Sequence, residues 1–274
     1  MIDETRLLNN LSFPLFVPAT RPERLAKAFA AGADTVIMDL EDAVSPDKKS
    51  DARRLPEGAV SKHRSGQFLL RVNAHSTQWY EDDVAFAAQA GFDGVVLPKA
   101  EDSRTVEALR ETLGEGRMII ALVETVHALS EIDAIARLSD RLAFGSIDFA
   151  EDMGCAHNQT ALLPIRSRIV QAARLAERPA PLDGVTTSTK EAELVRRDAA
   201  HASEMGFGGK LLIHPMQIEP SRGAFRPDAE SIAWAERVLA GGGTEDARSV
   251  DGAMVDAPVV ARARRIVQRA KDLS

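Results

Sequence analysis

Two acidic residues, Glu124 and Asp148, could together hold one metal ion. Glu124 ends the apolar stretch IIALVE and Asp148 follows LAFGSI, so each is expected to begin a loop that leads into a helix. Because parallel strands carry the residues at their carboxyl ends toward the following loops, both carboxylates should emerge on the same side. Two carboxylates offer the oxygen ligands that Mg²⁺ prefers and leave positions open for water and substrate. The pair predicts an open metal site in an enzyme.

The other expected strands also end in polar residues. Asp39, Glu41 and Asp42 lie in MDLEDAV; the remaining residues of this kind are Arg71, Asn73, Lys99 and His214. A single charged strand end is most simply a solvated loop entrance. A whole set of acids with one arginine and one lysine indicates an enzyme site at the mouth of a barrel.

Arg71 is suited to substrate binding, because its guanidinium can form two parallel hydrogen bonds to a carboxylate or a carbonyl oxygen. An ion pair with Glu41 or Asp42 is the simpler alternative, and both roles can hold together. The acids of MDLEDAV would repel one another without a cation or an arginine. At least one of them is therefore expected to orient Arg71.

Other chemistries have weaker support. Lys99 could form a Schiff base if it were desolvated, although a buried counter-ion role is favoured. The histidines, including His127, His157 and His214, lack the close spacing of a zinc site. No glycine-rich loop opens a helix after a strand, so a nucleotide cofactor is unsupported.

The elements that must position these residues alternate between short apolar runs and helical patterns, which is typical of a parallel α/β fold. Strands are expected at 15–17, 35–38, 68–72, 94–97, 118–123, 142–144, 182–185 and 210–213. Helices are expected at 22–31, 77–90, 102–112, 126–137, 161–177 and 190–205. Eight strands favour a (β/α)₈ TIM barrel over an open sheet.

The pattern changes after Ile213. Pro215, Pro220, Pro227 and the glycines at 241–243 interrupt it, and further helices are expected only at 228–239 and 257–271. We therefore expect a catalytic barrel over residues 1–216 and additional C-terminal helices over 217–274, which form an extension or lid of the same domain. The glycine run is either a simple connector or a hinge for that lid.

Composition excludes several classes of protein. The chain has 274 residues, a net charge of −7 and 45% hydrophobic residues, which argues against binding to nucleic acid or to an anionic membrane surface. Cys155 is the single cysteine, so a reducing cytoplasm is the expected location. No apolar stretch reaches the roughly 20 residues of a membrane span, and the N-terminus lacks the apolar core of a secretion signal.

Several short motifs in a fixed order resemble the citrate lyase β-subunit-like branch of the HpcH/HpaI aldolase superfamily. They are LFVPAT at 15–20, MDLEDAV at 38–44, RVN at 71–73, LPK at 97–99, ET at 124–125, FGSIDFA at 144–150 and GKLLIHP at 209–215. The likeness continues through MVDAP at 254–258 and so covers most of the chain. Ala19 and Val126-His127 depart from the common pattern near the mouth, which leaves the acyl substrate more open than the reaction class.

The resemblance implies a Mg²⁺-dependent lyase that cleaves a carbon–carbon bond in a 3-hydroxyacyl thioester. It implies that Glu124 and Asp148 are the metal ligands, with Glu124 also at the substrate, that Arg71 binds substrate, and that Glu41 and Asp42 are catalytic acidic support. Asp256 matches an aspartate on a C-terminal lid that often reaches a neighbouring subunit. An acyl-CoA substrate and a homo-oligomer, a trimer or a multiple of it, are implied as well.

Within this family, cleavage of (3S)-citramalyl-CoA to acetyl-CoA and pyruvate is the favoured reaction. Malyl-CoA cleavage and citryl-thioester cleavage in a citrate lyase complex are the alternatives, and the three differ only by a small substituent, which one sequence does not distinguish. Two readings come from other classes: a metal-free aldolase that uses Lys99, and a catalytically silent subunit that binds CoA esters.

Overall fold

The computed structural model describes residues 11–54, 66–240, 248–250 and 253–273. The chain divides into two compact units, Met1–Ser221 and Arg222–Ser274. The first unit holds all the strands of the large sheet, and we describe each unit by itself.

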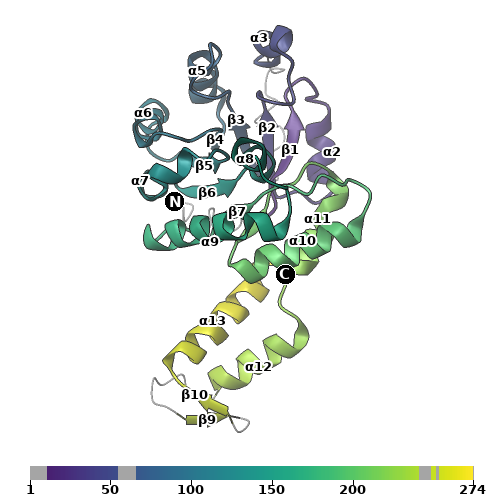
Figure 1. The fold of residues 1–274 in the computed structure, drawn as a ribbon. Coiled ribbons are helices and arrows are strands. Elements are labelled where there is room, and N and C mark those ends of the chain that lie inside the picture. Colours follow the sequence, from purple (N-terminus) through teal and green to yellow (C-terminus); the bar gives the residue numbers. More distant parts are fainter. Residues whose placement is uncertain (1–10, 55–65, 241–247, 251–252, 274) are drawn as a thin grey trace. The chain divides into compact units, whose positions relative to one another are not determined.

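The first unit is a parallel α/β barrel whose strands follow one another in chain order (Figure 1). The strands are β1 (Leu15–Pro18), β2 (Thr35–Asp39), β3 (Gln67–Arg71), β4 (Gly94–Leu97), β5 (Met118–Val123), β6 (Arg141–Phe144), β7 (Leu182–Asp183) and β8 (Gly209–Lys210). The sheet closes on itself, because Leu15 pairs in parallel with Leu212 just beyond β8. The Phe16 N–H donates to the Leu212 carbonyl at 2.8 Å and the Lys210 N–H to the Ser12 carbonyl at 2.8 Å. The predicted (β/α)₈ fold is confirmed.

Helices connect the strands and cover the outside of the barrel. They are α2 (Arg24–Ala30), η1 (Pro46–Lys48), α3 (Lys49–Ala52), α5 (Tyr80–Ala90), α6 (Ser103–Leu113), α7 (Ala128–Leu138), α8 (Ser146–Met153), α9 (Gln159–Leu175) and α10 (Ala192–Met205). After β8 come η2 (Pro215–Gln217) and α11 (Ile218–Phe225), and α11 spans the boundary between the two units. The strands are short and almost continuously apolar because both of their faces are covered, one by the barrel interior and one by these helices.

The barrel interior is a packed apolar core contributed by alternate residues of the strands. It includes Ile37, Leu69, Val96, Ile120, Leu122, Ala143, Leu182 and Leu211, all nearly inaccessible to solvent. Side chains two residues apart on a strand share a face, so this list fixes which later residues of each strand point into the mouth.

Sequence and structure differ in three places that matter for function. Residues 146–153, expected as a loop around Asp148, form α8. The expected strand at 210–213 is reduced to Gly209–Lys210. A helix, α11, lies where Pro220 was expected to interrupt the chain; Pro220 falls in its first turn, where a missing N–H leaves no internal hydrogen bond unmade.

The second unit pairs two helices with a small hairpin. It contains α12 (Ala229–Ala240), β9 (Arg248–Val250), β10 (Ala253–Val255) and α13 (Ala257–Asp272), and β9 and β10 are antiparallel. Ala235, Val238, Val255, Val260 and Ala263 form its own apolar core. Its role as a lid remains a prediction, and the glycine run at 241–243 lies outside the described residues.

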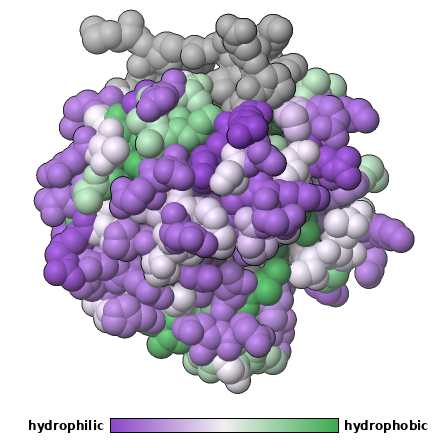
Figure 2. All heavy atoms as spheres, turned by 90° about the horizontal axis from the view of Figure 1, so that it is seen from above, coloured by the Kyte–Doolittle hydropathy of each residue, from purple (hydrophilic) through white to green (hydrophobic). Residues whose placement is uncertain are grey.

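The surface seen in Figure 2 is mostly hydrophilic and carries small, separate hydrophobic patches. In the described part of the chain, no helix combines the length and apolar character needed to cross a lipid bilayer.

Candidate functional site

Three charged side chains point into the barrel mouth because each continues the inward face of its strand. Asp39 lies two residues beyond Ile37, Arg71 two beyond Leu69, and Glu124 two beyond Leu122. Residues two apart on a strand share a face. On each of these three strands the inward-facing side chains are therefore apolar in the core and become charged at the mouth. All three residues are at least nine-tenths buried.

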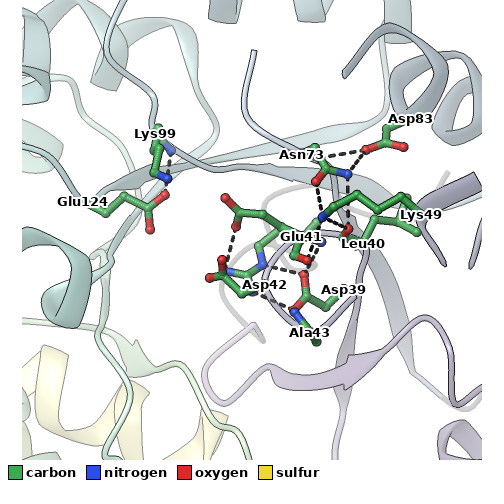
Figure 3. A network of polar contacts seen from close by, with 11 residues as sticks. Asp39, Leu40, Glu41, Asp42, Ala43, Lys49, Asn73, Asp83, Lys99 and Glu124 are labelled. Carbon is green, nitrogen blue, oxygen red and sulfur yellow. Dashed lines mark hydrogen bonds and ion pairs between the residues drawn. The ribbon is translucent and has the colours of Figure 1, made fainter. Parts of the chain in front are cut away.

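Asp39 is the residue that orients Arg71. Its Oδ1 accepts from Arg71 Nε at 2.7 Å and its Oδ2 accepts from Arg71 Nη2 at 2.6 Å. The same carboxylate accepts from the backbone N–H groups of Glu41 and Ala43 at 2.9 and 3.2 Å (Figure 3). One aspartate therefore fixes both the guanidinium and the loop that carries the next acids. The sequence predicted that an acid of MDLEDAV orients Arg71, but not that this acid is Asp39.

Glu41 and Asp42 flank the remaining edge of Arg71. Nη1 lies 3.0 Å from Glu41 Oε2 and 3.4 Å from Asp42 Oδ2. Glu41 is buried, whereas the Asp42 side chain is 63% exposed. The Glu41 Oε2 atom is buried and makes no hydrogen bond, although it lies within ion-pair range of Nη1. The expected ion pair is thus present, and its buried carboxylate oxygen has no hydrogen-bond partner.

Glu124 is held by a backbone group that follows β4. Its Oε1 accepts from the backbone N–H of Lys99 at 2.8 Å (Figure 3). Lys99 adopts a left-handed backbone with φ of 45°, a conformation that L-residues adopt at a cost and that clusters at functional sites. The Lys99 side chain is exposed, so the expectation of a buried counter-ion is wrong. The desolvation that a Schiff-base lysine requires is absent too.

Gly145 makes room for Glu124 and starts the helix that carries Asp148. A Cβ at position 145 would lie 2.5 Å from Glu124 Oε2 and would also collide with Glu124 Cβ. Asp148 is half-buried in the first turn of α8. The helix is held to the loop after β5, because Asp152 Oδ2 accepts from the Val126 N–H at 2.7 Å. Glu124 and Asp148 thus reach the same mouth from neighbouring strands, as predicted, although Asp148 does so from a helix.

The mouth is a cavity of about 380 Å³ lined by these charges and by apolar side chains. Its polar lining includes Asp39, Asp42, Arg71, Glu124 and Asp148, and its apolar lining includes Phe16, Leu122, Phe144 and Ile147. The Arg71 guanidinium also lies over the Phe16 ring at 4.7 Å. A mostly apolar pocket with a few convergent charges is typical of a small-molecule site.

Negative charge is in excess at the mouth, and the pKa values reflect this excess. Burial raises the pKa of Glu124 to about 8, and the like charges of Glu41 and Asp148 add to the rise. Burial raises the pKa of Glu41 to about 7, against the opposing effect of Arg71. The pKa of Asp148 is raised by burial and by Asp42. Burial would lower the pKa of Arg71, but Asp39 and the other acids hold it above its ordinary value.

These residues fit a divalent cation. Glu124 and Asp148 supply two oxygen ligand groups, and Glu41 adds a buried oxygen without a hydrogen-bond partner. Among the described residues, no three acidic, histidine or cysteine side chains gather as a metal cage. Mg²⁺ is commonly held by only one or two carboxylates and completes its shell with water and substrate. A cation here would neutralise the charge that raises the pKa values of these acids.

A buried lysine that the sequence analysis did not identify supports the loop after β2. Lys49 Nζ donates to the carbonyls of Leu40 and Glu41 at 3.0 and 2.9 Å and to Asn73 Oδ1 at 2.5 Å (Figure 3). Asn73 in turn donates through its backbone N–H and its Nδ2 to Asp83 Oδ2 at 2.9 and 2.6 Å. No spacing rule points to Lys49, because it lies in the short α3 and reaches the site only through the fold.

Two further predicted residues have local structural roles. His214 caps η2, where its Nδ1 accepts from the Met216 N–H at 3.2 Å. Asp256 caps α13, where its Oδ1 accepts from the Val259 N–H at 3.2 Å. Asp256 belongs to the second unit, so its role at the mouth remains a prediction.

Comparison with known proteins identifies the family. Residues 12–215 match the family described as HpcH/HpaI aldolase/citrate lyase. A citrate lyase subunit beta-like protein of Mycobacterium tuberculosis is 37% identical over 268 residues, which cover 93% of this chain and 94% of the relative. A (3S)-malyl-CoA thioesterase of Cereibacter sphaeroides is 31% identical over 253 residues, which cover 90% of this chain and 88% of the relative.

A solved structure agrees with these matches. The crystal structure of CitE from Mycobacterium tuberculosis in complex with magnesium, acetoacetate and coenzyme A has a TM-score of 0.81 and 35% sequence identity. The match covers 95% of this chain and 98% of that chain. The order of the motifs, the closed barrel and these matches along nearly the whole chain lead to one conclusion: the chain belongs to the HpcH/HpaI aldolase/citrate lyase family.

Proposed function

We propose that this protein is a Mg²⁺-dependent carbon–carbon lyase that acts on a 3-hydroxyacyl-CoA thioester. The observation that carries the proposal is the surplus of buried carboxylates around Glu124, Asp148 and Glu41 beside a single oriented arginine, Arg71. This arrangement can take up a cation and an oxygen-rich substrate together. Family relatives named citrate lyase subunit beta and the CitE structure with magnesium and coenzyme A support the same reaction class.

The proposed reaction breaks the bond between the carbinol carbon and the carbon next to the thioester. The hydroxyl becomes a ketone, the bonding electrons pass to the thioester as an enolate, and the proton lost by the hydroxyl is balanced by one gained at the enolate carbon. Mg²⁺ held by Glu124 and Asp148 would supply Lewis-acid polarisation of the substrate hydroxyl and its neighbouring carboxylate.

Arg71 is proposed to stabilise the enolate oxygen through the edge that bears Nη1. The opposite edge is already committed to Asp39 in two hydrogen bonds, so the guanidinium is oriented before substrate arrives. Preorganised donors of this kind contribute about 3–4 kcal/mol to a transition state. Glu41 and Asp42 keep Nη1 in place, and Asp256 is proposed as the proton donor to the enolate carbon.

The acyl group that we propose is (3S)-citramalyl, which gives acetyl-CoA and pyruvate. The cavity lining includes Phe16, Leu122 and Phe144, and these apolar side chains suit a methyl group on the carbinol carbon better than the carboxymethyl group of a citryl thioester. Malyl-CoA, with hydrogen at that position, differs by one methyl group, a change worth about 1–3 kcal/mol. A homotrimer is proposed from the family likeness alone.

Hydrolysis of a thioester is the second candidate reaction. It is favoured by the relative named (3S)-malyl-CoA thioesterase, which covers 90% of this chain. The same mouth could hold a water molecule against the thioester carbonyl, and the two reactions differ in their products. Lyase action gives acetyl-CoA and a keto acid, whereas hydrolysis gives free CoA and an intact hydroxy acid.

The test is a product analysis on (3S)-citramalyl-CoA and (S)-malyl-CoA, each with Mg²⁺ and with EDTA. We expect equal amounts of acetyl-CoA and pyruvate from the first substrate, with both products lost in EDTA. Free thiol without acetyl-CoA would instead identify a thioesterase. Turnover that survives EDTA and is trapped by borohydride would support the Lys99 alternative, and binding of CoA esters without turnover would support the silent subunit.

A further inference from the structure

A second polar cavity lies on the outer side of the barrel wall, between β7, β8, α9 and α10. It measures about 510 Å³, and its lining includes Arg166, Asp183, Thr187, Arg197, His201 and Lys210. It adjoins the mouth, because Val185 lines both cavities. Nothing in the proposed lyase reaction uses its charged residues.

The two acids of this cavity have their oxygens engaged. Asp183 Oδ1 accepts from Arg166 Nε at 2.9 Å, and its Oδ2 pairs with Lys210 Nζ at 3.5 Å. Asp198 Oδ2 accepts from the Thr186 hydroxyl at 2.9 Å, and its Oδ1 accepts from Gln159 Nε2 at 3.4 Å. The carboxylates are thus occupied by donors already present in the wall.

Donors remain in excess. The Arg166 side chain is 92% buried, since its relative exposure is 8%, and its Nη1 has no hydrogen-bond partner. His201 Nε2 is likewise buried without a partner. The Arg166 guanidinium also lies over the Phe144 ring at 5.4 Å. It nevertheless shares the single carboxylate of Asp183 with Lys210, so two buried cations face one anion, and an incompletely compensated buried charge is disfavoured.

We propose that this cavity is a binding site for a small oxyanion of the phosphate type, with Arg166 as its principal ligand. Arg197, which is exposed on α10, and Thr187 also line the cavity and add side chains that can donate hydrogen bonds. The loops after strands seven and eight of (β/α)₈ barrels frequently form phosphate sites, and Thr187 follows β7 in this way. The site is distinct from the metal site and does not depend on the proposed reaction.

The test measures thermal unfolding of the purified protein against inorganic phosphate, with sodium acetate and with sodium chloride of matched ionic strength as separate series. A ligand that binds the native state raises the melting temperature in a saturable way. We expect saturation with phosphate, a smaller effect of acetate, and only a shallow linear effect of chloride. An equal or larger saturable response to acetate would overturn the phosphate assignment.

Three variants locate the effect. Arg166→Gln retains a polar group near Asp183 but removes Nη1, and should weaken phosphate binding about tenfold or more, as expected for loss of a charged hydrogen bond. Arg197→Gln removes an exposed lining charge and should weaken binding by a smaller factor. Arg196→Gln is the matched control, because Arg196 is exposed, pairs with Glu193 and does not line the cavity. This variant should leave the affinity unchanged.

The proposal fails if phosphate gives no saturable shift beyond that of chloride. It also fails if Arg197→Gln and Arg196→Gln bind phosphate equally to the wild type, a comparison that remains available if Arg166→Gln does not fold. A wild-type affinity in folded Arg166→Gln would place any bound phosphate elsewhere, such as at Arg71.

Discussion

The two cavities of the barrel carry opposite surpluses of charge. At the mouth, five acids outnumber Arg71 and the exposed Lys99, and burial raises the pKa of Glu124 and of Glu41. In the neighbouring cavity, two acids are shared among three cationic side chains, and a buried guanidinium nitrogen has no partner. The same principle applies to both cavities: a buried charge without enough opposite charge around it indicates that the ligand carries the opposite charge.

The charged residues of the two cavities are also brought together in different ways. The mouth residues Asp39, Arg71 and Glu124 continue the inward rows of the core, so strand periodicity delivers them. The second cavity gathers Arg166 from a helix and Asp183 and Lys210 from the outer faces of strands. Its members meet only after the helices have packed against the barrel.

The largest expected effect comes from removing one negative charge at the mouth. Glu124→Gln keeps the size of the side chain but weakens the metal site, and we expect metal-dependent turnover to fall by about 10³-fold or more. In EDTA at a pH above about 8, where Glu124 of the wild type is ionised, the same variant should melt at a higher temperature than the wild type, because it removes a charge that burial and neighbouring acids disfavour. Steady-state assays and melting curves in Mg²⁺ and in EDTA check both results.

Arg197→Gln, on the other cavity, is the control for this first prediction. It should retain lyase turnover and show no gain in stability in EDTA. If Glu124→Gln instead lowered the apo melting temperature, the claimed surplus of negative charge at the mouth would be wrong.

The next largest effect is expected from removing the hydrogen bonds that Lys49 donates to the loop after β2. Lys49→Met keeps the aliphatic stem but leaves the Leu40 and Glu41 carbonyls and Asn73 Oδ1 without their donor. We expect the free energy of unfolding to fall by about 3 kcal/mol, since each unsatisfied buried group costs about 1–3 kcal/mol. Urea denaturation measures the change. The exposed neighbour Lys48 provides the control, and Lys48→Met should change stability by less than about 0.5 kcal/mol.

A smaller effect is expected from adding one methyl group beside the metal carboxylate. In Gly145→Ala the new Cβ would displace the Glu124 carboxylate, and a misplacement of about 1 Å costs about 10²-fold in turnover. The Mg²⁺ concentration needed for half-maximal activity should rise as well. Gly223→Ala is the matched control, because a Cβ there meets nothing within 4 Å. Equal activity of both variants would show that Glu124 is not constrained by Gly145.

The smallest effect tests the burial of Tyr80 at the start of α5. Burial raises the pKa of Tyr80 to about 12, with a further contribution from Glu81. Tyr80 is the single tyrosine of the chain, so the phenolate absorbance in an alkaline titration reports this residue alone. Because the pKa is raised, the folded state favours the protonated phenol, and this contribution to stability is lost as the pH rises from about 10 through about 12. Titration near 10 in folded protein would contradict the burial.

Much of the barrel was predictable because its strands are short apolar runs with little ambiguity. The strands at 94–97 and 118–123 have the predicted bounds, and the others differ by a few residues. The prediction was least accurate for the last strand. β8 comprises only Gly209–Lys210, and the chain then pairs with β1 through Leu212. Pairing across the barrel closure depends on residues far apart in sequence, so local pattern does not fix it.

The charged residues of the mouth were predictable from their places after strands, but their partners were not. The sequence could not assign Asp39 rather than Glu41 as the bidentate partner of Arg71, because that choice depends on the inward register of β2. It also could not show that Lys99 has an exposed side chain and a left-handed backbone while its N–H donates to Glu124. Lys49 and Arg166 lie in helices with no distinguishing local signal.

The backbone at Lys99 has a consequence for protein engineering. The residue contributes its N–H to Glu124 while its side chain is exposed, so the identity of the side chain is separable from the structural role of the position. Asparagine, which tolerates the left-handed conformation better than most residues, should preserve the hydrogen bond there. Position 99 is therefore a place to attach a fluorescent reporter close to Glu124 while keeping the N–H that holds this carboxylate.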